Sequence, residues 1–253
     1  MTKGISSLAV IEPGVKIGNN PSIDAFTIIR SGTRLGNDVK IGSHCEIGIP
    51  SPLAKTSYLS IGSSSTIRSH SIIYSGSVLE DKFTCGHNVI IRENTEIGEN
   101  VKIGSLSDIQ GDCVIEKFSR LHSSVFVGKY SQIGKYVWIF PYVVLTNDSS
   151  PPSKQLEGVR VQDFAIIATM STVMPGVVVG FGSLVGAHSL VTKNIPPETV
   201  VFGAPAKIVK QISDIRSPTD AKAQYPWVTR YREGYPDNLP QIYQEMRSHH
   251  NLI

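Results

Sequence analysis

The chain of 253 residues lacks the features that mark disulfide-rich, zinc-binding or membrane proteins. It has only three cysteines, Cys45, Cys85 and Cys113, and no pair of them has C-x-x-C spacing, which disfavours a disulfide framework and a zinc cluster. The first residues contain no apolar segment of signal-peptide length, and no apolar run long enough to span a bilayer follows. These absences predict a soluble, cytoplasmic protein that uses no metal and does not associate with membranes.

Charge is also scarce in this chain. Asp, Glu, Lys and Arg make up 18% of the residues, the net charge is +3, and the basic residues form no run. A nucleic-acid-binding surface requires Lys and Arg clustered on one face. Nucleic acid is therefore not expected as a partner.

The main positive feature is a repeat of six residues. An aliphatic residue recurs at every sixth position from Ile11 to Ile47. The phase restarts at Ile61 and runs through fifteen hexads to Leu145, with Cys85 the only non-aliphatic residue, and six more hexads follow from Val161. Neither a strand nor a helix explains a period of six. Each of the 28 hexads is expected to form one short strand and one turn, and three hexads to form one triangular coil of a parallel β-helix. The prediction is an all-β solenoid of about nine coils.

This coil geometry gives each hexad position a direction. Residues 18 apart lie above one another on neighbouring coils, about 4.8 Å apart. First positions point into the core, and Cys85 is a first position while Cys45 and Cys113 are fifth positions, so all three are expected to be buried as small hydrophobic residues. Glycine often follows the aliphatic residue, as at Gly104 and Gly186, where we expect it to relieve turns with an unfavourable φ.

Two interruptions and a tail depart from the repeat. The first interruption, Ile49–Leu59, is interpreted as a surface excursion, and the second predicts a projecting loop near residues 147–158, which serves either as a functional wall or as a tolerated insertion. The repeat predicts a β-helix domain over residues 1–206 and an extension over 207–253 that packs on the last coils. Asp237–Pro240 predicts the start of a helix that continues over residues 241–248. The aromatic residues of the tail either stack on a base or pack on the coils: Tyr225, Trp227, Tyr231 and Tyr235.

Polar side chains gather at one edge in this register. His87 and His122 belong to hexads of the same face two coils apart, and Asp108 ends the hexad between them. Asn94, with Arg92 and Glu93, belongs to the next face at the level of His87. A lone outward histidine is most often only solvated, so the constellation matters more than any one member. The predicted polar cluster consists of His87, Asn94, Asp108, His122 and Ser123.

The repeat over residues 11–209 resembles the hexapeptide-repeat acyltransferases, and this resemblance implies that the β-helix is left-handed. The segment VFGAPAK at Val201–Lys207 is similar to the terminus of acetyl-CoA-dependent sugar acetyltransferases. The γ-class carbonic anhydrases share the fold, but their zinc-ligand pattern is missing, because Val127 and Lys117 stand five residues from His122. Several segments resemble a narrower group, the N-acetyltransferases of dTDP-3-amino-3,6-dideoxyhexoses. These segments are Thr84–Asn94, Gly104–Cys113, Leu121–Ser123, Trp138–Asp148 and the tail YPWVTRYREGYP.

This resemblance implies transfer of an acetyl group from acetyl-CoA to the amine of a nucleotide-linked sugar, for lipopolysaccharide or another surface glycan, by a homotrimer with active sites between subunits. His122 is the best match to the family's polar active-site residue, as a base or as an orienting group, with Asp108 or Asn94 as its partner. The expected substrate-binding residues are His87, Arg92, Glu93, Ser123, Asn147 and Asp148. The expected CoA-binding residues are the small residues Ala168, Gly186 and Ala187 along the pantetheine arm, with Lys193 and Lys207 at the phosphates.

Three other functions stay open at this point. The first is an O-acetyltransferase of a simple sugar or serine, in which a well-placed base is essential because a hydroxyl attacks poorly until it is deprotonated. The second is an acetyltransferase of a UDP-linked 3-amino sugar. The third is a non-catalytic β-helix scaffold, which predicts no binding of acetyl-CoA.

Overall fold

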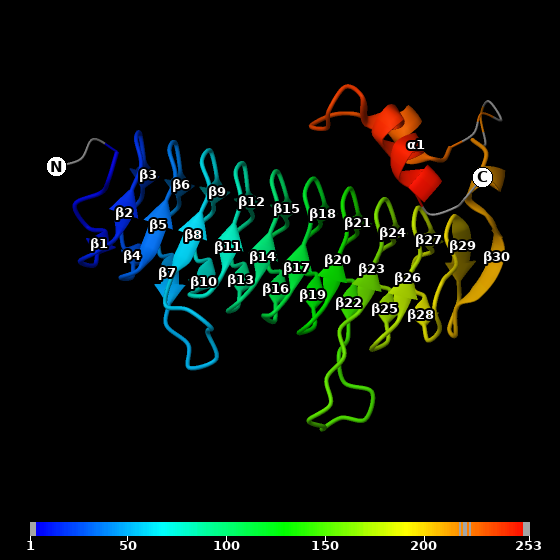
Figure 1. Cartoon of the computed structure of the whole chain (residues 1–253), viewed down its shortest axis with the longest axis horizontal. Helices are drawn as coiled ribbons and strands as arrows, with labels where there is room; N and C mark the ends of the chain where they lie inside the picture. Colours follow the sequence, from blue (N-terminus) through cyan, green and yellow to red (C-terminus); the bar gives the residue numbers. More distant parts are fainter. Residues whose placement is uncertain (1–3, 218, 220–221, 223, 250–253) are drawn as a thin grey trace.

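The computed structural model describes residues 4–217, 219, 222 and 224–249; the outermost residues of the two predicted domain ranges lie outside this part. The chain forms a parallel β-helix with a C-terminal extension beside it (Figure 1). The hexads predicted from the sequence are the strands β1–β28, most of them two residues long. Their order assigns every third strand to the same sheet, so that three parallel sheets form the sides of the solenoid.

The three sheets contain ten, nine and eleven strands. The ten-stranded sheet consists of β1 (Val10–Ile11), β4 (Ile28–Ile29), β7 (Glu46–Ile49), β10 (Ile72–Tyr74), β13 (Ile90–Ile91), β16 (Asp108–Ile109), β19 (Phe126–Val127), β22 (Val144–Leu145), β25 (Thr172–Val173) and β28 (Leu190–Val191). The nine-stranded sheet consists of β2 (Lys16–Ile17), β5 (Thr33–Leu35), β8 (Leu59–Ile61), β11 (Val78–Leu79), β14 (Glu96–Ile97), β17 (Val114–Ile115), β20 (Gln132–Ile133), β23 (Arg160–Val161) and β26 (Val178–Val179). The eleven-stranded sheet consists of β3 (Ser22–Ile23), β6 (Lys40–Ile41), β9 (Thr66–Ile67), β12 (Thr84–Cys85), β15 (Lys102–Ile103), β18 (Arg120–Leu121), β21 (Trp138–Ile139), β24 (Ile166–Ile167), β27 (Leu184–Val185), β29 (Thr199–Phe202) and β30 (Lys207–Gln211).

The solenoid is slightly longer than the nine coils predicted. β29 pairs in parallel with β27, and β30 then pairs antiparallel with β29, so these two strands extend the eleven-stranded sheet beyond the last hexad. Within the repeat the register is as expected: Ile91 pairs with Ile109, 18 residues along the chain. The register also survives the interruptions, because Ile139 pairs with Ile167 across the second loop.

The core follows the hexad positions. The aliphatic first positions from Ile23 to Val191 are buried and form one continuous cluster. The three cysteines are buried and unpaired, as predicted. Burial raises the pKa of the Cys85 thiol to about 12 and that of Cys113 to about 11, so neither is a nucleophile at neutral pH.

The glycines that follow the aliphatic residues have a different role from the one expected. Gly104 and Gly186 do not have positive φ, so relief of backbone strain does not explain them. A Cβ on Gly104 would lie 2.3 Å from the backbone nitrogen of Ser123, and one on Gly186 would lie 2.7 Å from the Cβ of Phe202. The glycines therefore permit close approach of neighbouring coils, while positive φ falls mostly on the fourth residue of each hexad, such as Asn88 and Asn94.

Both interruptions project from the same corner of the solenoid. The first loop joins β7 to β8 and the second joins β22 to β23, and each passes from the ten-stranded to the nine-stranded sheet. Figure 1 shows the two loops extending from the same side of the molecule. The predicted loop near residues 147–158 is confirmed.

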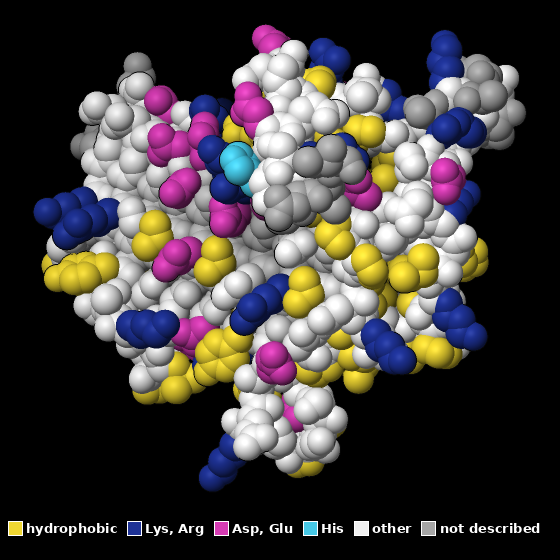
Figure 2. All heavy atoms as spheres, turned by 45° about the vertical axis from the view of Figure 1, so that its right-hand side comes forward, with side chains coloured by type: hydrophobic (Ala, Val, Ile, Leu, Met, Phe, Trp, Pro, Cys, Tyr) yellow, Lys and Arg dark blue, Asp and Glu magenta, His cyan; other side chains and the backbone are white. Residues whose placement is uncertain are grey.

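The extension contains η1 (Ile212–Asp214), η2 (Trp227–Thr229) and α1 (Leu239–His249), which confirms the predicted helix. It folds back over the solenoid, with α1 at the level of β24 and β27 (Figure 1), and Gly234 reaches the coils of Asn100 and Arg120. The extension thus covers middle coils as well as the last ones. In the described part of the chain no helix is long and apolar enough to cross a bilayer. On the face seen in Figure 2, basic, acidic and apolar side chains are interspersed.

A second apolar cluster, separate from the solenoid core, attaches the extension. Tyr136, Phe164 and Phe181 of the solenoid pack against Trp227 and residues of α1. The Phe164 ring lies 4.7 Å from that of Tyr136 and 5.0 Å from that of Tyr243. The extension is therefore fixed by aromatic packing along one corner.

An ion pair joins α1 to the last coils. Arg247 donates to Glu198 at 2.7 and 2.8 Å, and the Tyr243 hydroxyl donates to the same carboxylate at 2.8 Å. Burial alone would raise the pKa of Glu198, but the hydrogen bonds from Arg247 and Tyr243 outweigh it and lower that pKa below its ordinary value. A carboxylate with a lowered pKa stabilises the folded state at neutral pH, and the stabilisation is lost as the pH falls through the lowered value.

We expect Glu198→Gln to lower the melting temperature at pH 7 and to have progressively less effect as the pH falls below the ordinary glutamate pKa of 4.5. Thermal unfolding of both proteins between neutral and acidic pH measures this difference. Glu80→Gln, at an exposed position directly after β11, serves as the control for loss of a surface charge. If the difference in melting temperature between the wild type and Glu198→Gln did not change with pH, the lowered pKa of Glu198 would be contradicted.

Candidate active-site cleft

A cleft of about 560 Å³ opens between the eleven-stranded sheet and the extension. The sheet contributes outward residues of β15, β18 and β21, and the extension contributes the segment after η2. The cleft is lined by Thr84, Lys102, Ile103, Gly104, Arg120, Leu121, His122, Ser123, Trp138, Tyr231, Glu233 and Gly234. It contains the histidine favoured by the sequence, so it is the candidate active site.

His122 follows β18 and is half-buried at the edge of this cleft. Its ring stacks on that of Phe140, with 4.7 Å between centroids and 12° between planes, and lies 5.7 Å from the Trp138 ring. Burial lowers the pKa of His122 below its ordinary value of 6.5. The imidazole is therefore neutral at pH 7, held in place by Phe140 and able to accept a proton.

Arg120 supplies positive charge to the same cleft. It is 7% exposed, and its guanidinium donates to the carbonyls of Asn100 and Gly234 and lies 4.8 Å from the Tyr235 ring. Burial lowers the pKa of Arg120, but an arginine keeps its charge at neutral pH. Among the described residues, no acidic side chain forms an ion pair with it. A buried cation without a counter-ion favours an anionic ligand in the cleft.

Small residues continue the column of His122 along the sheet. The strand pairing places Phe140 beside His122, and Ala168 and Gly186 on the next two coils. Neither residue has a side chain large enough to fill the surface there. Two of the residues expected to bind CoA, Ala168 and Gly186, therefore form a track that continues the column of His122. Ala168 lies about 10 Å from His122 along the axis.

The other three residues expected to bind CoA lie at different places. Ala187 is exposed in the turn that follows Gly186, and Lys207 is exposed in β30 at the end of the same sheet. Lys193 follows β28 of the ten-stranded sheet, at another corner of the solenoid. Lys207 is thus on the sheet that carries the track, and Lys193 is not.

The polar cluster predicted from the sequence is divided by the structure. His87 and Ser123 lie in turns that join the eleven-stranded to the ten-stranded sheet, the same corner at which His122 lies. Asp108 is instead an outward residue of β16 in the ten-stranded sheet. Burial raises the pKa of Asp108, and Gln110 and Arg92 of the same sheet oppose this rise. The structure places the Asp108 carboxyl among these residues and on a different sheet from His122.

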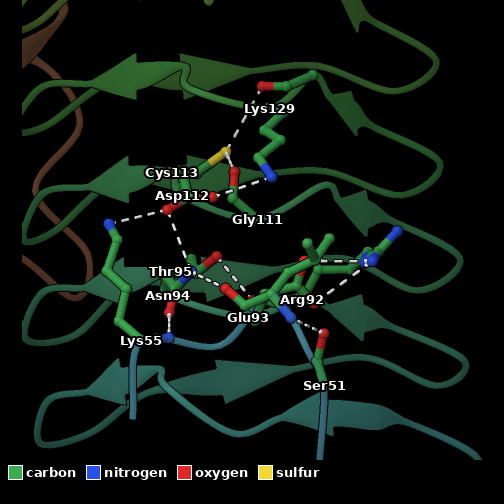
Figure 3. A network of polar contacts seen from close by, with 12 residues as sticks. Ser51, Lys55, Arg92, Glu93, Asn94, Thr95, Gly111, Asp112, Cys113 and Lys129 are labelled. Carbon is green, nitrogen blue, oxygen red and sulfur yellow. Dashed lines mark hydrogen bonds and ion pairs between the residues drawn. The ribbon is translucent and has the colours of Figure 1, made fainter.

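Asn94, Arg92 and Glu93 belong to a corner network beside the first loop (Figure 3). The Asn94 side chain donates to the Leu53 carbonyl at 2.9 Å and accepts from the Lys55 amide at 2.8 Å. It also donates to Asp112, which forms ion pairs with Lys55 at 2.9 Å and Lys129 at 3.1 Å. The fully buried Glu93 pairs with Arg92 at 3.2 Å. These contacts hold the first loop against the solenoid.

Asn147 and Asp148 lie at the same corner, at the base of the second loop. The Asp148 carboxylate accepts hydrogen bonds from the Ser150 and Ser153 amides, which lower its pKa although burial opposes them. The Asn147 carbonyl accepts from the Glu157 amide at 2.8 Å. Within one chain, both residues shape their own loop, on a different corner from His122.

Replacing Asn94 with alanine is expected to release the first loop while leaving the solenoid intact. The variant loses both hydrogen bonds to the loop backbone, so the Lys55 amide should exchange with solvent about tenfold faster. Hydrogen–deuterium exchange of residues 50–58 measures this. Asn88→Ala is a matched control, because Asn88 has nearly the same positive φ, 56° against 58°, at a corner without a loop. Equal exchange in the two variants would argue against a loop-holding role.

Several cleft residues were not singled out by the sequence as site residues. Arg120 and Lys102 are outward positions 18 residues apart on adjacent strands, and Trp138 continues the same row. This row of two cations and an indole on one face could have indicated the cleft from the sequence. Tyr231 and Gly234 complete the cleft through a fold-back that no periodic pattern predicts. Among the described residues no group of three or more His, Cys, Asp or Glu side chains is placed to hold a metal ion.

The first hexads of the chain are similar in sequence to a repeat of bacterial transferases. Residues 6–48 match the family model described as bacterial transferase hexapeptide (six repeats). The bifunctional protein GlmU of Desulfitobacterium hafniense is 28% identical over 199 residues, which cover 76% of this chain and 39% of that protein. A 2,3,4,5-tetrahydropyridine-2,6-dicarboxylate N-acetyltransferase of Staphylococcus aureus is 37% identical over 83 residues, 33% of this chain and 34% of that protein. The chain spans well under half the length of these relatives.

The fold also has counterparts among solved structures. The UDP-N-acetylglucosamine acyltransferase of Arabidopsis superposes with a TM-score of 0.62 and 18% identity, over 82% of this chain and 74% of that one. At this identity the similarity concerns the fold alone. The family model thus matches the first hexads of the repeat, and the solved structure has the same fold.

Proposed function

We propose that the protein is an acetyl-CoA-dependent N-acetyltransferase acting on the amino group of a nucleotide-linked sugar, of the dTDP-3-amino-3,6-dideoxyhexose type. The observation that carries the proposal is the cleft, in which a neutral, half-buried His122 lies beside the buried cation of Arg120. The histidine suits proton transfer, and the cation suits a phosphate-bearing substrate. The Staphylococcus aureus relative, which is named for N-acetyl transfer, supports the reaction class.

The proposed reaction forms a C–N bond and breaks the C–S bond of the thioester. The amine nitrogen attacks the thioester carbonyl, His122 accepts the proton that the nitrogen loses, and the CoA thiolate leaves and takes up a proton. A sugar amine is partly neutral near pH 7, so positioning in the cleft supplies much of the acceleration. The track over Ala168 and Gly186 is where the pantetheine arm lies in this proposal, because neither residue projects a long side chain on the two coils that follow Phe140.

The test is release of free CoA from acetyl-CoA in the presence of different acceptors. A dTDP-3-amino sugar should release CoA faster than its UDP-linked counterpart, a simple sugar or serine. The three buried cysteines keep the background low in a thiol assay. Release with hydroxyl acceptors alone would replace the proposal with an O-acetyltransferase. No release with any acceptor, together with no calorimetric binding of CoA, would leave only a scaffold.

The proposed assembly is a homotrimer with active sites between subunits. The ten-stranded sheet offers a surface for it, because most of its outward strand residues are apolar and half-buried in the single chain: Ile28, Ile72, Ile90, Phe126, Val144 and Leu190. Apolar rows of this extent on a monomer surface are typical of interaction sites.

Phe126→Glu is expected to dissociate the assembly, because it buries a charge in an apolar contact. Light scattering should give about three times the chain mass of 27.5 kDa for the wild type and a single chain mass for the variant. Gln132→Glu, an outward position of the nine-stranded sheet, is the control and should leave the mass unchanged. A wild-type mass equal to one chain would contradict the assembly.

A further inference from the structure

A second hollow adjoins the active-site cleft and is built almost entirely of aromatic rings. It has a volume of about 230 Å³ and is lined by Trp138, Phe140, Ile166, Tyr225, Trp227, Arg230 and Tyr231. Trp138 and Tyr231 line both spaces, so the hollow and the cleft share a wall. Phe140 lines the hollow and stacks on His122, which connects the aromatic wall to the histidine.

Phe140 stacks on Trp138 in this hollow, with 26° between planes, but two other rings meet Trp138 edge to face. Tyr231 stands at 79° to Trp138 with 5.7 Å between centroids, and Trp227 stands at 81° to Trp138 at 6.0 Å. Perpendicular packing leaves ring faces that the neighbouring rings do not cover. A flat ligand with π-faces is the kind of group that such walls accept.

Exposure separates the ring that faces solvent from those that hold the extension. Trp227 is 6% exposed and Tyr235 9%, as expected for side chains that fix the fold, but Tyr231 is 42% exposed at the junction of the two spaces. A large ring left open to water beside a cleft contributes little to folding. It is available to a ligand.

Charge at this end of the cleft is positive. The Arg230 guanidinium lies 5.6 Å from the Tyr225 ring, and its Nε donates to the Gln224 carbonyl at 2.7 Å. Arg120 and Lys102 line the adjoining cleft and outnumber its one acidic lining residue, Glu233. A ligand that combines a flat ring with phosphate groups could therefore place its ring in the aromatic hollow and its phosphates beside the basic residues of the cleft.

We infer that the aromatic hollow is a nucleobase subsite, in which the base lies against Tyr231 and Trp138 while the attached phosphates and reacting group extend toward Arg120 and His122. This inference rests on the proposed function, since it identifies where the substrate's base is held. The base belongs either to the nucleotide of the sugar acceptor or to the adenine nucleotide of acetyl-CoA. Both share the same chemistry, and the ligands used below distinguish them.

The protein carries its own reporter for this subsite. Its only two tryptophans, Trp138 and Trp227, both line the hollow. A base that enters should change the intrinsic tryptophan fluorescence in a saturable way. The probes are dTDP and UDP for the acceptor, adenosine 3′,5′-bisphosphate for the CoA end, and inorganic pyrophosphate as a ligand without a ring.

We expect at least one base-bearing probe to quench the fluorescence, and pyrophosphate not to. Tyr231→Ala should weaken that binding about tenfold, while Tyr231→Phe keeps it within about threefold of the wild type. Tyr58→Ala removes another exposed tyrosine ring, from the first loop, and is the control. Tyr231→Leu keeps the bulk without the ring, and circular dichroism verifies that the variants are folded.

The inference is overturned if no base-bearing probe changes the fluorescence, if pyrophosphate changes it equally, or if Tyr231→Ala and Tyr231→Leu bind as the wild type does. Quenching by dTDP or UDP assigns the subsite to the acceptor, and quenching by the adenosine bisphosphate alone assigns it to CoA. Binding is measured without acyl transfer. Quenching without CoA release therefore defeats the proposed function and leaves the subsite, whereas CoA release without quenching does the reverse.

Discussion

Replacing His122 with alanine is expected to lower kcat/KM for an amino-sugar acceptor about 100-fold. A positioned base contributes roughly 10²–10⁴-fold, and an amine acceptor belongs at the lower end of this range because it attacks without full deprotonation. A hydroxyl acceptor would place the loss at the upper end. The size of the loss therefore also reports which acceptor the enzyme uses.

The same base should appear in the pH profile. Burial lowers the pKa of His122 below 6.5, and the neutral imidazole is the active form. The wild-type kcat/KM should therefore rise with pH along a limb whose midpoint lies below 6.5, and the limb should disappear in His122→Ala. His70→Ala removes an exposed histidine at the same corner but outside the cleft, and is the control. If His122→Ala kept kcat/KM within about threefold of the wild type, His122 would have no role as a base.

Among the proposed substitutions, Phe164→Ala is expected to lower the free energy of unfolding most, by about 3–5 kcal/mol. Phe164 is fully buried between Tyr136 of the solenoid and Tyr243 of α1, outside the solenoid core. Its loss leaves a cavity where the extension is attached. The extension should therefore detach at lower urea concentration than the solenoid unfolds.

Two probes separate these events. Tryptophan fluorescence reports the contact with the extension, because Trp138 and Trp227 both pack in this cluster, and far-UV circular dichroism reports the solenoid. The matched control is Phe26→Ala, since Phe26 has nearly the same φ, 63° against 59°, but is 54% exposed. The control should lose less than about 0.5 kcal/mol. Coincident fluorescence and dichroism transitions in Phe164→Ala would show that the extension and the solenoid unfold as one unit.

Detachment of the extension should also remove activity. Tyr231, Glu233 and Gly234 form one wall of the cleft, and they belong to the extension, which is attached through the packing of η2 and α1. Phe164→Ala should accordingly lower kcat/KM although Phe164 lies outside the cleft. This couples the stability measurement to the site.

The site was harder to predict than the fold because some of its residues belong to the repeat and others are brought to it by the fold-back of the extension. Spacing alone put His87, His122 and Ser123 at one corner, as the turns after β12 and β18 show. The same reasoning grouped Asn94 and Asp108 with them. Asn94 instead holds the first loop, and the Asp108 carboxyl faces outward from another sheet. A period of six gives a residue its level along the axis, but a one-position difference around a turn moves a side chain to another sheet.

The sequence by itself determined the solenoid, its 28 hexad strands, the buried cysteines, the second loop and the helix near the C-terminus. Each follows from a local rule, since a hexad forms one strand and one turn wherever it occurs. The tertiary structure decided where the extension lies, that its aromatic residues form both an attachment and a hollow, and that Arg120 and Tyr231 share a cleft with His122. These depend on contacts between residues about 100 positions apart, such as Arg120 with Gly234. Packing fixes such contacts, and no repeat encodes them.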